Sequence, residues 1–330
     1  MPRERFFSCT SAKHTPQSLK TDIAYNATVS MKLIRQGKVK DVYEVDTHTL
    51  EFVFSDKISV FDKTIPSLIP HKGETLCRSS AFWFQVARAS GIKTHFRELI
   101  PPNRMRVQKV QVLEYPKINK KTVNYLIPLE VICRHYVAGS LWDRVHSGEV
   151  KPAKLGFKAS KEVKYGDKLP EPFIELTTKM EKYDRLLTKK EAVKIAALTN
   201  NEYDEIVKSV LALDERIAEE VEKRDLIHVD GKKEYAFDEN RELMIVDTFG
   251  TADEDRWWDW ENYSKGQFLE LSKENVRQYY RQLGYYDKLA EARKMGKGEP
   301  KIPSLPESKI KEVSELYIDM LERITGESYR

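Results

Sequence analysis

The feature that most constrains the fold is an acidic tract over residues 232–254, whose first part reads KKEYAFDENRELMIVD. Two β-prone runs flank the turn sequence DENR, which predicts an antiparallel hairpin. Glu234 and Asp247 would then lie on neighbouring strands, where two carboxylates can hold a hard cation such as Mg²⁺. The same pattern also fits a hairpin with a charged, solvent-exposed face, because exposed acids are common. The tract continues as TFGTADEDRWWD, which places Asp253 and Arg256 in the loop that leaves the hairpin.

Composition narrows the class of protein. A chain of 330 residues with 40% apolar content can bury the core of two subdomains. The net charge of only +4 argues against the concentrated basic field of a nucleic-acid binder, so small-molecule partners are expected. The three cysteines, Cys9, Cys77 and Cys133, form no CxxC pair, which favours a reduced, cytoplasmic setting. No apolar run approaches the roughly 18 residues that cross a bilayer, so we expect no membrane association.

The pattern of apolar residues divides the chain into three parts. Residues 1–30 are rich in Ser, Thr and Lys and predict a flexible extension. Residues 31–121 predict a β-rich lobe with one helix over residues 75–90. Residues 122–330 predict a larger α/β lobe that begins with the buried strand VNYLIPLEVICRHYV. We therefore expect an α/β fold of the α+β type, built as two lobes.

Within the second lobe, the Lys-, Pro- and Gly-rich residues 151–172 predict a surface loop, and residues 294–306 predict irregular structure. Helices are expected over residues 202–224, 273–282 and 307–324. In the first of these, apolar residues recur at helical spacing and indicate core packing. The terminal helices could cover the monomer's own core or pair with a second copy, so a homo-oligomer is compatible with the sequence.

Two lysines near the start of the β-rich lobe are candidate phosphate ligands. In the sequence RQGKVKDVYEV, Gly37 permits a tight turn, and Lys38 and Lys40 would point the same way from the following strand. Such a pair could clamp a triphosphate. It could equally protect a strand edge, because the sequence matches neither established glycine-rich phosphate loop.

Arg134 is a candidate anion ligand, because it interrupts an apolar strand where an unpaired guanidinium would be costly. Its partner is either an internal carboxylate or a bound phosphate that the planar guanidinium grips with two hydrogen bonds. Gly139 and Ser140 follow at the start of a helix, a natural phosphate seat, and support the second alternative. Lys179 and Asp184 add a cation and an anion that could also be a solvated pair.

Taken in order, several blocks resemble the SAICAR synthetase family, phosphoribosylaminoimidazole-succinocarboxamide synthase. The blocks are GKVKDVY, SDKISVFD, IPHKG, EVICRHYVAGS, TTKMEKYD, VDGKKEY and DTFGTADEDRWWD. The resemblance implies a cytoplasmic ligase of purine biosynthesis that uses ATP and Mg²⁺. It would join carboxyaminoimidazole ribotide (CAIR) to L-aspartate through an acyl phosphate, with ATP in the cleft between the lobes.

The resemblance also implies a role for each candidate residue. The ATP ligands would be Lys38, Lys40, Ser59, Asp62 and Lys232, and the Mg²⁺ ligands would be Glu234 and Asp247. The ribotide ligands would be Arg134, Ser140, Asp230 and Arg256, and the residues at the reacting centre would be Lys179, Asp184 and Asp253. Phosphoryl transfer between two anions needs charge neutralisation and alignment, so the chemistry requires no side-chain nucleophile.

The sequence departs from the family pattern at several positions. Thr248 follows Asp247 where the family usually has Glu, TADEDR replaces TPDSSR, and Tyr183 replaces a His. Glu254 and Asp255 should weaken anion binding nearby unless they point outward. There are also insertions at residues 151–172 and after residue 284. Two alternatives therefore stay open, namely another ATP-dependent enzyme acting on a related ribotide and a non-catalytic nucleotide-binding regulator.

Overall fold

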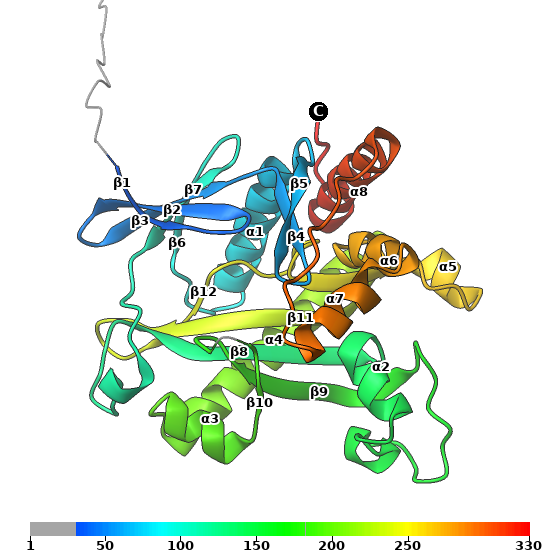
Figure 1. Ribbon diagram of the computed structural model, residues 1–330. Helices are drawn as coiled ribbons and strands as arrows, with labels where there is room; N and C mark the ends of the chain where they lie inside the picture. Colours follow the sequence, from blue (N-terminus) through cyan, green and yellow to red (C-terminus); the bar gives the residue numbers. More distant parts are fainter. Residues whose placement is uncertain (1–30, 182) are drawn as a thin grey trace, which may run out of the picture. The chain divides into compact units, whose positions relative to one another are not determined.

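Two large antiparallel sheets organise the computed structural model, which describes residues 31–181 and 183–330 (Figure 1). The predicted extension over residues 1–30 and Cys9 lie outside the described residues. Among the described residues, no helix combines the length and the apolar character that a membrane span requires. The α/β fold predicted from the sequence is confirmed, and the division at residue 121 falls between the last strand of one sheet and the first strand of the other.

The first sheet has the strand order β1-β2-β3-β7-β6. Its strands are β1 (Lys32–Gln36), β2 (Lys40–Asp46), β3 (Thr49–Phe54), β6 (Phe96–Ile100) and β7 (Arg104–Gln108). Helix α1 (Lys72–Ala89) packs against this sheet, and a two-stranded ribbon, β4 (Lys57–Val60) and β5 (Lys63–Leu68), lies between β3 and α1 in the chain. Phe52 and Phe54 alternate along β3 and are buried together in the core.

Helix α1 begins three residues before its predicted start, at Lys72 rather than residue 75. The backbone N–H of Gly73 donates to the carboxylate of Asp56 at 2.9 Å, so a residue far back in the sequence satisfies one of the free N–H groups of the first turn. Local capping signals cannot reveal such a contact, which explains the shift.

The second sheet has the order β10-β9-β8-β11-β12, with β13 also paired to β11. Its strands are β8 (Tyr125–Tyr136), β9 (Lys168–Thr178), β10 (Leu186–Leu187), β11 (Leu226–Phe237), β12 (Leu243–Val246) and β13 (Asp255–Asp259). The predicted loop over residues 151–172 is wrong at both ends. A 3₁₀ turn, Pro152–Leu155, forms near its start, and β9 begins at Lys168. Strand β9 tolerates Pro170 and Pro172 because it pairs with β8 on one side and with β10 only at its far end.

Helix α4 (Asn200–Glu222) packs against β11 and β8 and confirms the predicted apolar stripe. The stripe residues Ile206, Val210, Leu213, Ile217 and Val221 are all buried. A capping box between Thr199 and Glu202 fixes the start of the helix. Asp214 is the one charged residue among the buried residues of this helix, and its partners come from the sheet.

The remaining helical segments either connect strands or follow the last strand, β13. They are α2 (Gly139–His146), α3 (Lys189–Ile195), α5 (Trp260–Ser264), α6 (Glu274–Gln282), α7 (Tyr285–Lys294), α8 (Glu307–Thr325) and the 3₁₀ turn Tyr115–Lys117. The irregular stretch predicted before α8 is confirmed. Helix α8 packs against α1 and α4, so its apolar face covers the chain's own core (Figure 1).

Candidate active site

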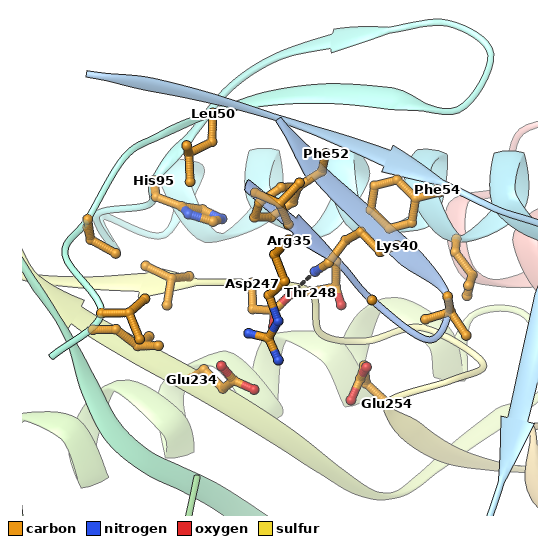
Figure 2. A pocket seen from close by; sticks show the side chains of 18 of the residues that line it. Arg35, Lys40, Leu50, Phe52, Phe54, His95, Glu234, Asp247, Thr248 and Glu254 are labelled. Atoms are coloured by element: carbon orange, nitrogen blue, oxygen red, sulfur yellow. Dashed lines mark hydrogen bonds and ion pairs between the residues drawn. The ribbon is translucent and has the colours of Figure 1, made fainter. Parts of the chain in front are cut away.

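A cavity of about 500 Å³ lies between the first sheet and the β11–β12 hairpin (Figure 2). One end is apolar and is lined by Leu50 and Phe52 from β3 and by Val246 from β12. The other end is charged and includes Lys40, Glu234 and Asp247. An apolar wall with a few converging polar groups is typical of a small-molecule site.

The predicted hairpin is confirmed, and it brings the two predicted metal ligands to this cavity. Glu234 on β11 is opposite Val246 on β12, and Asp247 follows directly in a left-handed backbone conformation with φ of 60°. The alternative of a solvent-exposed hairpin face is wrong for Glu234, which is only 1% exposed. Figure 2 shows both carboxylates pointing into the cavity.

Lysines compensate the charge of the two carboxylates. Lys40 forms an ion pair with Asp247, while Glu234 pairs with Lys179 and, at 2.6 Å, with Lys232. Burial alone would raise the pKa of Asp247, but the ammonium groups of these three lysines outweigh it and hold the pKa below its usual value. Burial alone would also raise the pKa of Glu234, but Lys232 and Lys179 lower it, so both acids are ionised at neutral pH.

Two ionised carboxylates that face one cavity fit Mg²⁺, a hard cation that prefers oxygen ligands. Asp247 and Glu234 are also close enough that each acts on the charge of the other, which favours a shared cation. The lysines hold the same acids in place without a metal ion.

Lys38 and Lys40 both line the cavity, but they do not share a strand as predicted. Lys38 lies in the bend before β2 and reaches Asp62 at 3.1 Å, whereas Lys40 begins β2 and lies over the ring of Phe52. Gly37 makes this bend feasible, because a Cβ at this position would clash with the backbone oxygen of Lys40.

Apart from the four predicted ribotide ligands, four predicted site residues do not line the cavity: Ser59, Asp62, Asp184 and Lys232, of which Lys232 reaches it through its ion pair with Glu234. Ser59 is on β4, Asp62 is in the turn after it, and Asp184 is exposed in the segment before β10. Asp62 still reaches the cavity indirectly through its ion pair with Lys38. Although Asp184 is exposed, neighbouring atoms remove part of its hydration and so raise the pKa of its carboxyl group.

Asp253 lines the cavity and is held by neighbouring groups. Lys72 donates to its carboxylate at 3.0 Å, Lys273 lies at 3.3 Å, and the Tyr317 hydroxyl also donates to it. Burial alone would raise the pKa of Asp253, yet Lys273 and Lys72 hold it well below its usual value. Lys72 is fully buried at the start of α1, where Asp253 is its counter-ion.

The four predicted ribotide ligands form a separate group, which we call the arginine cluster: Arg134, Ser140, Asp230 and Arg256. The guanidinium of Arg134 contacts Asp230 at 3.2 Å and the Ser140 hydroxyl at 3.2 Å. Arg256 forms an ion pair with the same Asp230 oxygen. The cluster sits where β8, β11 and β13 approach the start of α2.

The sequence left open whether Arg134 pairs with an internal carboxylate or a phosphate, and the structure supplies internal carboxylates. Glu175 on β9 accepts from Arg134 Nε at 2.7 Å and also from Arg144. Glu175 gave no signal in the sequence, because its contact depends on the pairing of β9 with β8. Gly139 has a φ of 51°, and a side chain there would collide with the guanidinium of Arg256.

On the opposite face of β11 lies a second ionic group, which we call the closed cluster: Lys233, Asp214, Asp255 and His228. Lys233 forms an ion pair with Asp214 from α4 and lies 3.2 Å from Asp255. His228 Nε2 lies 2.7 Å from the same Asp255 oxygen. All four side chains have 0% exposure.

The contacts of the closed cluster show which way the Asp255 side chain points. The sequence left open whether this acid points outward, and it is directed inward, where Lys233 and the backbone N–H of Gly250 bind it. Gly231 permits this approach, since a Cβ there would clash with the Asp255 carboxylate. Glu254, by contrast, lines the cavity and lies 3.4 Å from Lys232.

Sequence reasoning missed three residues that belong to the cavity or its surroundings. Lys72 stands in the IPHKG block, where no local pattern singles out one residue for the site. Arg35 on β1 points toward Glu234 in Figure 2, and His95 lies just before β6 at the apolar end. Neither Arg35 nor His95 stands in a recognisable motif, so only the fold reveals that they face the cavity.

The family model for SAICAR synthetase matches residues 33–292, which is most of the chain. The chain belongs to the SAICAR synthetase family. It is 55% identical to the phosphoribosylaminoimidazole-succinocarboxamide synthase of Thermoplasma volcanium over 299 residues, covering 91% of this chain and all of the relative. It is therefore an ATP-dependent ligase of purine biosynthesis.

Solved structures of SAICAR synthetases share the fold. A SAICAR synthetase in complex with ADP matches with a TM-score of 0.64 and 25% identity, covering 90% of this chain and 99% of the other. The Saccharomyces cerevisiae enzyme complexed with SAICAR matches with a TM-score of 0.70 and 24% identity, covering 96% and 99%. The long match extends over both sheets, so the departures at Thr248 and in TADEDR lie within a conserved architecture.

Proposed function

We propose that this SAICAR synthetase binds ATP in the cavity, holds Mg²⁺ with Glu234 and Asp247, and binds the 5′-phosphate of CAIR at the arginine cluster. One observation carries the proposal. Asp230, Lys232 and Glu234 alternate on a single face of β11, so one rigid strand links the arginine cluster to the acid pair. Four residues of strand span about 13 Å, a distance that suits a ribotide with its phosphate at one end and its carboxylate at the other.

In this proposal, the two ends of the cavity bind different parts of the nucleotide. The apolar end, with Leu50 and Val246, suits the flat base, while Lys38 and Lys40 offset the charge of the triphosphate. A solved SAICAR synthetase of the same fold is in complex with ADP, which supports nucleotide binding by this chain. When bound, Mg²⁺ would neutralise negative charge between the nucleotide and the substrate carboxylate.

The chemistry proceeds in two steps. A carboxylate oxygen of CAIR attacks the γ-phosphorus, the bond to the bridging oxygen breaks, and ADP leaves. The amine of L-aspartate then attacks the acyl carbon, phosphate leaves, and the nitrogen loses a proton. Lys179, whose ammonium pairs with Glu234, would offset the charge that gathers on the transferring phosphoryl group.

Asp184 and Asp253 complete the proposed reacting centre. The charges of Lys232 and Lys179 act on the exposed Asp184, and in this proposal Asp184 would interact with the incoming amine. Asp253 would act through Lys72, whose ammonium it holds. Ser59 and Asp62 keep their proposed place beside the nucleotide, Asp62 through Lys38.

Arg134 would bind phosphate while keeping its internal partners. Glu175 and Asp230 fix the plane of the guanidinium, while Ser140 and the first N–H groups of α2 lie beside it. Arg256 shares Asp230 with Arg134 and would add a second positive charge.

Cys77 and Cys133 are free thiols, in keeping with a cytoplasmic enzyme.

A coupled assay of ADP release tests the proposal. We expect ADP release to require CAIR, L-aspartate and Mg²⁺ together. Release with a different acceptor would instead indicate a related ligase, an outcome that the TADEDR loop makes worth checking. Tight ATP binding without release of ADP under any combination would indicate a regulator and contradict the proposal.

A further inference from the structure

Arg35 lies on β1, the edge strand of the first sheet, and its side chain lines the cavity. The register of β1 with β2 shifts between Leu33 and Arg35, which leaves Ile34 as the extra residue of a β-bulge. In a regular strand, neighbouring side chains point to opposite faces, yet Ile34 and Arg35 both line the cavity. The bulge therefore accounts for the direction of the Arg35 side chain.

The cations that line the cavity differ in their partners. Four of them are lysines that each form an ion pair with an acidic residue of the chain: Lys38, Lys40, Lys109 and Lys179. The guanidinium of Arg35, by contrast, forms no ion pair or hydrogen bond within residues 31–181 and 183–330. Arg35 is exposed, so a ligand in the cavity can reach it. An anionic ligand can thus bind Arg35 without breaking an existing ion pair.

Arg35 and the two acids of the site belong to opposite walls of the cavity. Arg35 extends from the first sheet, whereas Glu234 and Asp247 belong to the β11–β12 hairpin and the residue that follows it. Figure 2 shows the guanidinium directed into the cavity toward Glu234. An anionic group between these walls would meet a positive charge on the side of Arg35. The planar guanidinium suits a phosphate, which it can bind with two parallel hydrogen bonds.

The position of Glu234 indicates which phosphate this is. Strand β11 carries both Glu234 and Asp230, and Asp230 belongs to the arginine cluster, where CAIR is proposed to bind. Glu234 therefore marks the side of the nucleotide that faces CAIR, and the phosphate on that side is the terminal one. We propose that Arg35 binds the γ-phosphate of ATP, the phosphoryl group that is transferred. This inference rests on the proposed ATP site.

Direct binding to the full-length protein with Mg²⁺ tests the inference. The two ligands are ADP and the β,γ-imido analogue of ATP, which has a γ-phosphate but resists its transfer. In Arg35→Met we expect the analogue to bind about tenfold more weakly, a modest loss for a charge-assisted contact because Arg35 is exposed. The affinity for ADP should stay nearly the same, since ADP lacks the γ-phosphate. Arg35→Lys keeps the charge without the planar guanidinium and should restore part of the loss.

Lys32→Met is the matched control. Lys32 is another exposed cation of β1 but lies outside the cavity wall, so this variant removes the same charge from the same strand. Its affinity for the analogue should stay near that of the unaltered protein. Thermal melting of each variant checks folding. Arg35→Met should melt together with the unaltered protein, because the guanidinium has no ion pair to lose within the described residues.

Three results would overturn the inference. They are an unchanged affinity of Arg35→Met for the analogue, an equal loss of affinity for ADP and the analogue, and an equal effect of Lys32→Met and Arg35→Met. Absence of all nucleotide binding by the unaltered protein would instead refute the proposed ATP site, so the two failures are distinguishable.

Discussion

The two faces of β11 carry ionic groups of similar composition in different surroundings. On one face, Lys232 and Glu234 join Lys179, Lys40 and Asp247 beside an open cavity. On the other, the closed cluster pairs Lys233 with Asp214 and Asp255 under helix α4. Consecutive lysines in the sequence, at positions 232 and 233, therefore belong to separate networks, because side chains of a strand alternate between its faces.

The comparison shows how the fold separates binding from stability. Helix α4 seals the closed cluster, so every charge there must be satisfied by the protein itself. The cavity side borders a space of about 500 Å³, so its lysines and acids can exchange partners with a nucleotide and Mg²⁺. Cys133, His135 and Asp214 offer donor atoms within 4.8 Å of one another, but Lys233 already supplies the positive charge that Asp214 needs.

The strongest test of the ionic group beside the cavity is the variant Asp247→Asn. We expect Mg²⁺-dependent turnover to fall several thousandfold, about 5 kcal/mol in the barrier, because the metal loses an anionic ligand. Steady-state ADP release measures the effect, and the unfolding transition should move little. Glu239→Gln, an exposed acid in the same hairpin, is the control and should be neutral. Unchanged turnover in Asp247→Asn would remove this residue from the metal site.

The matching test of the closed cluster is the variant Lys233→Met. The change leaves Asp214 and Asp255 buried without their shared cation, so we expect the free energy of unfolding to fall by about 4 kcal/mol. Urea unfolding gives this value. Turnover per folded molecule should stay near that of the unaltered enzyme. A loss of turnover without a loss of stability would show that the closed cluster takes part in catalysis.

The variant Arg134→Met tests whether the arginine cluster binds substrate, as proposed for the ionic group beside the cavity, or only stabilises the fold, as expected for the closed cluster. We expect the KM for the ribotide to rise by an amount equal to about 1.5–3 kcal/mol, the worth of a charge-assisted contact. The KM values for CAIR, ATP and L-aspartate are compared in one assay. A shift confined to L-aspartate would contradict the phosphate role. Loss of stability with an unchanged ribotide KM would make this cluster structural, like the closed one.

The smallest expected effect is a pH dependence of the stability difference between the unaltered protein and Lys233→Met. Burial alone would raise the pKa of Asp214, but Lys233 holds it well below its usual value. A depressed carboxyl pKa contributes stability above the usual value of about 4, and this stability is lost as the pH falls further. Urea unfolding at pH 7 and pH 3 should show a smaller difference at pH 3. An equal or larger difference at pH 3 would contradict the linkage.

Much of the architecture was predictable because it rests on local patterns. The β11–β12 hairpin follows from a turn between two β-prone runs, and α4 follows from its apolar period and its capping box. The early start of α1 and the strand over Lys168–Thr178 were not predictable. Each depends on a partner distant in sequence, Asp56 for α1 and strand β8 for β9.

The residues of the candidate site likewise fall into those that local sequence patterns predicted and those that only the fold revealed. The sequence by itself determined which residue types were available and their order along the chain, including the paired acids Glu234 and Asp247. Only the tertiary structure decided that Lys40 meets Asp247 across 207 positions, that Arg134 has internal carboxylates, and that His95 faces the cavity. The physical reason is that ion pairing and burial depend on distances in space, which strand pairing and helix packing set over long separations in the chain.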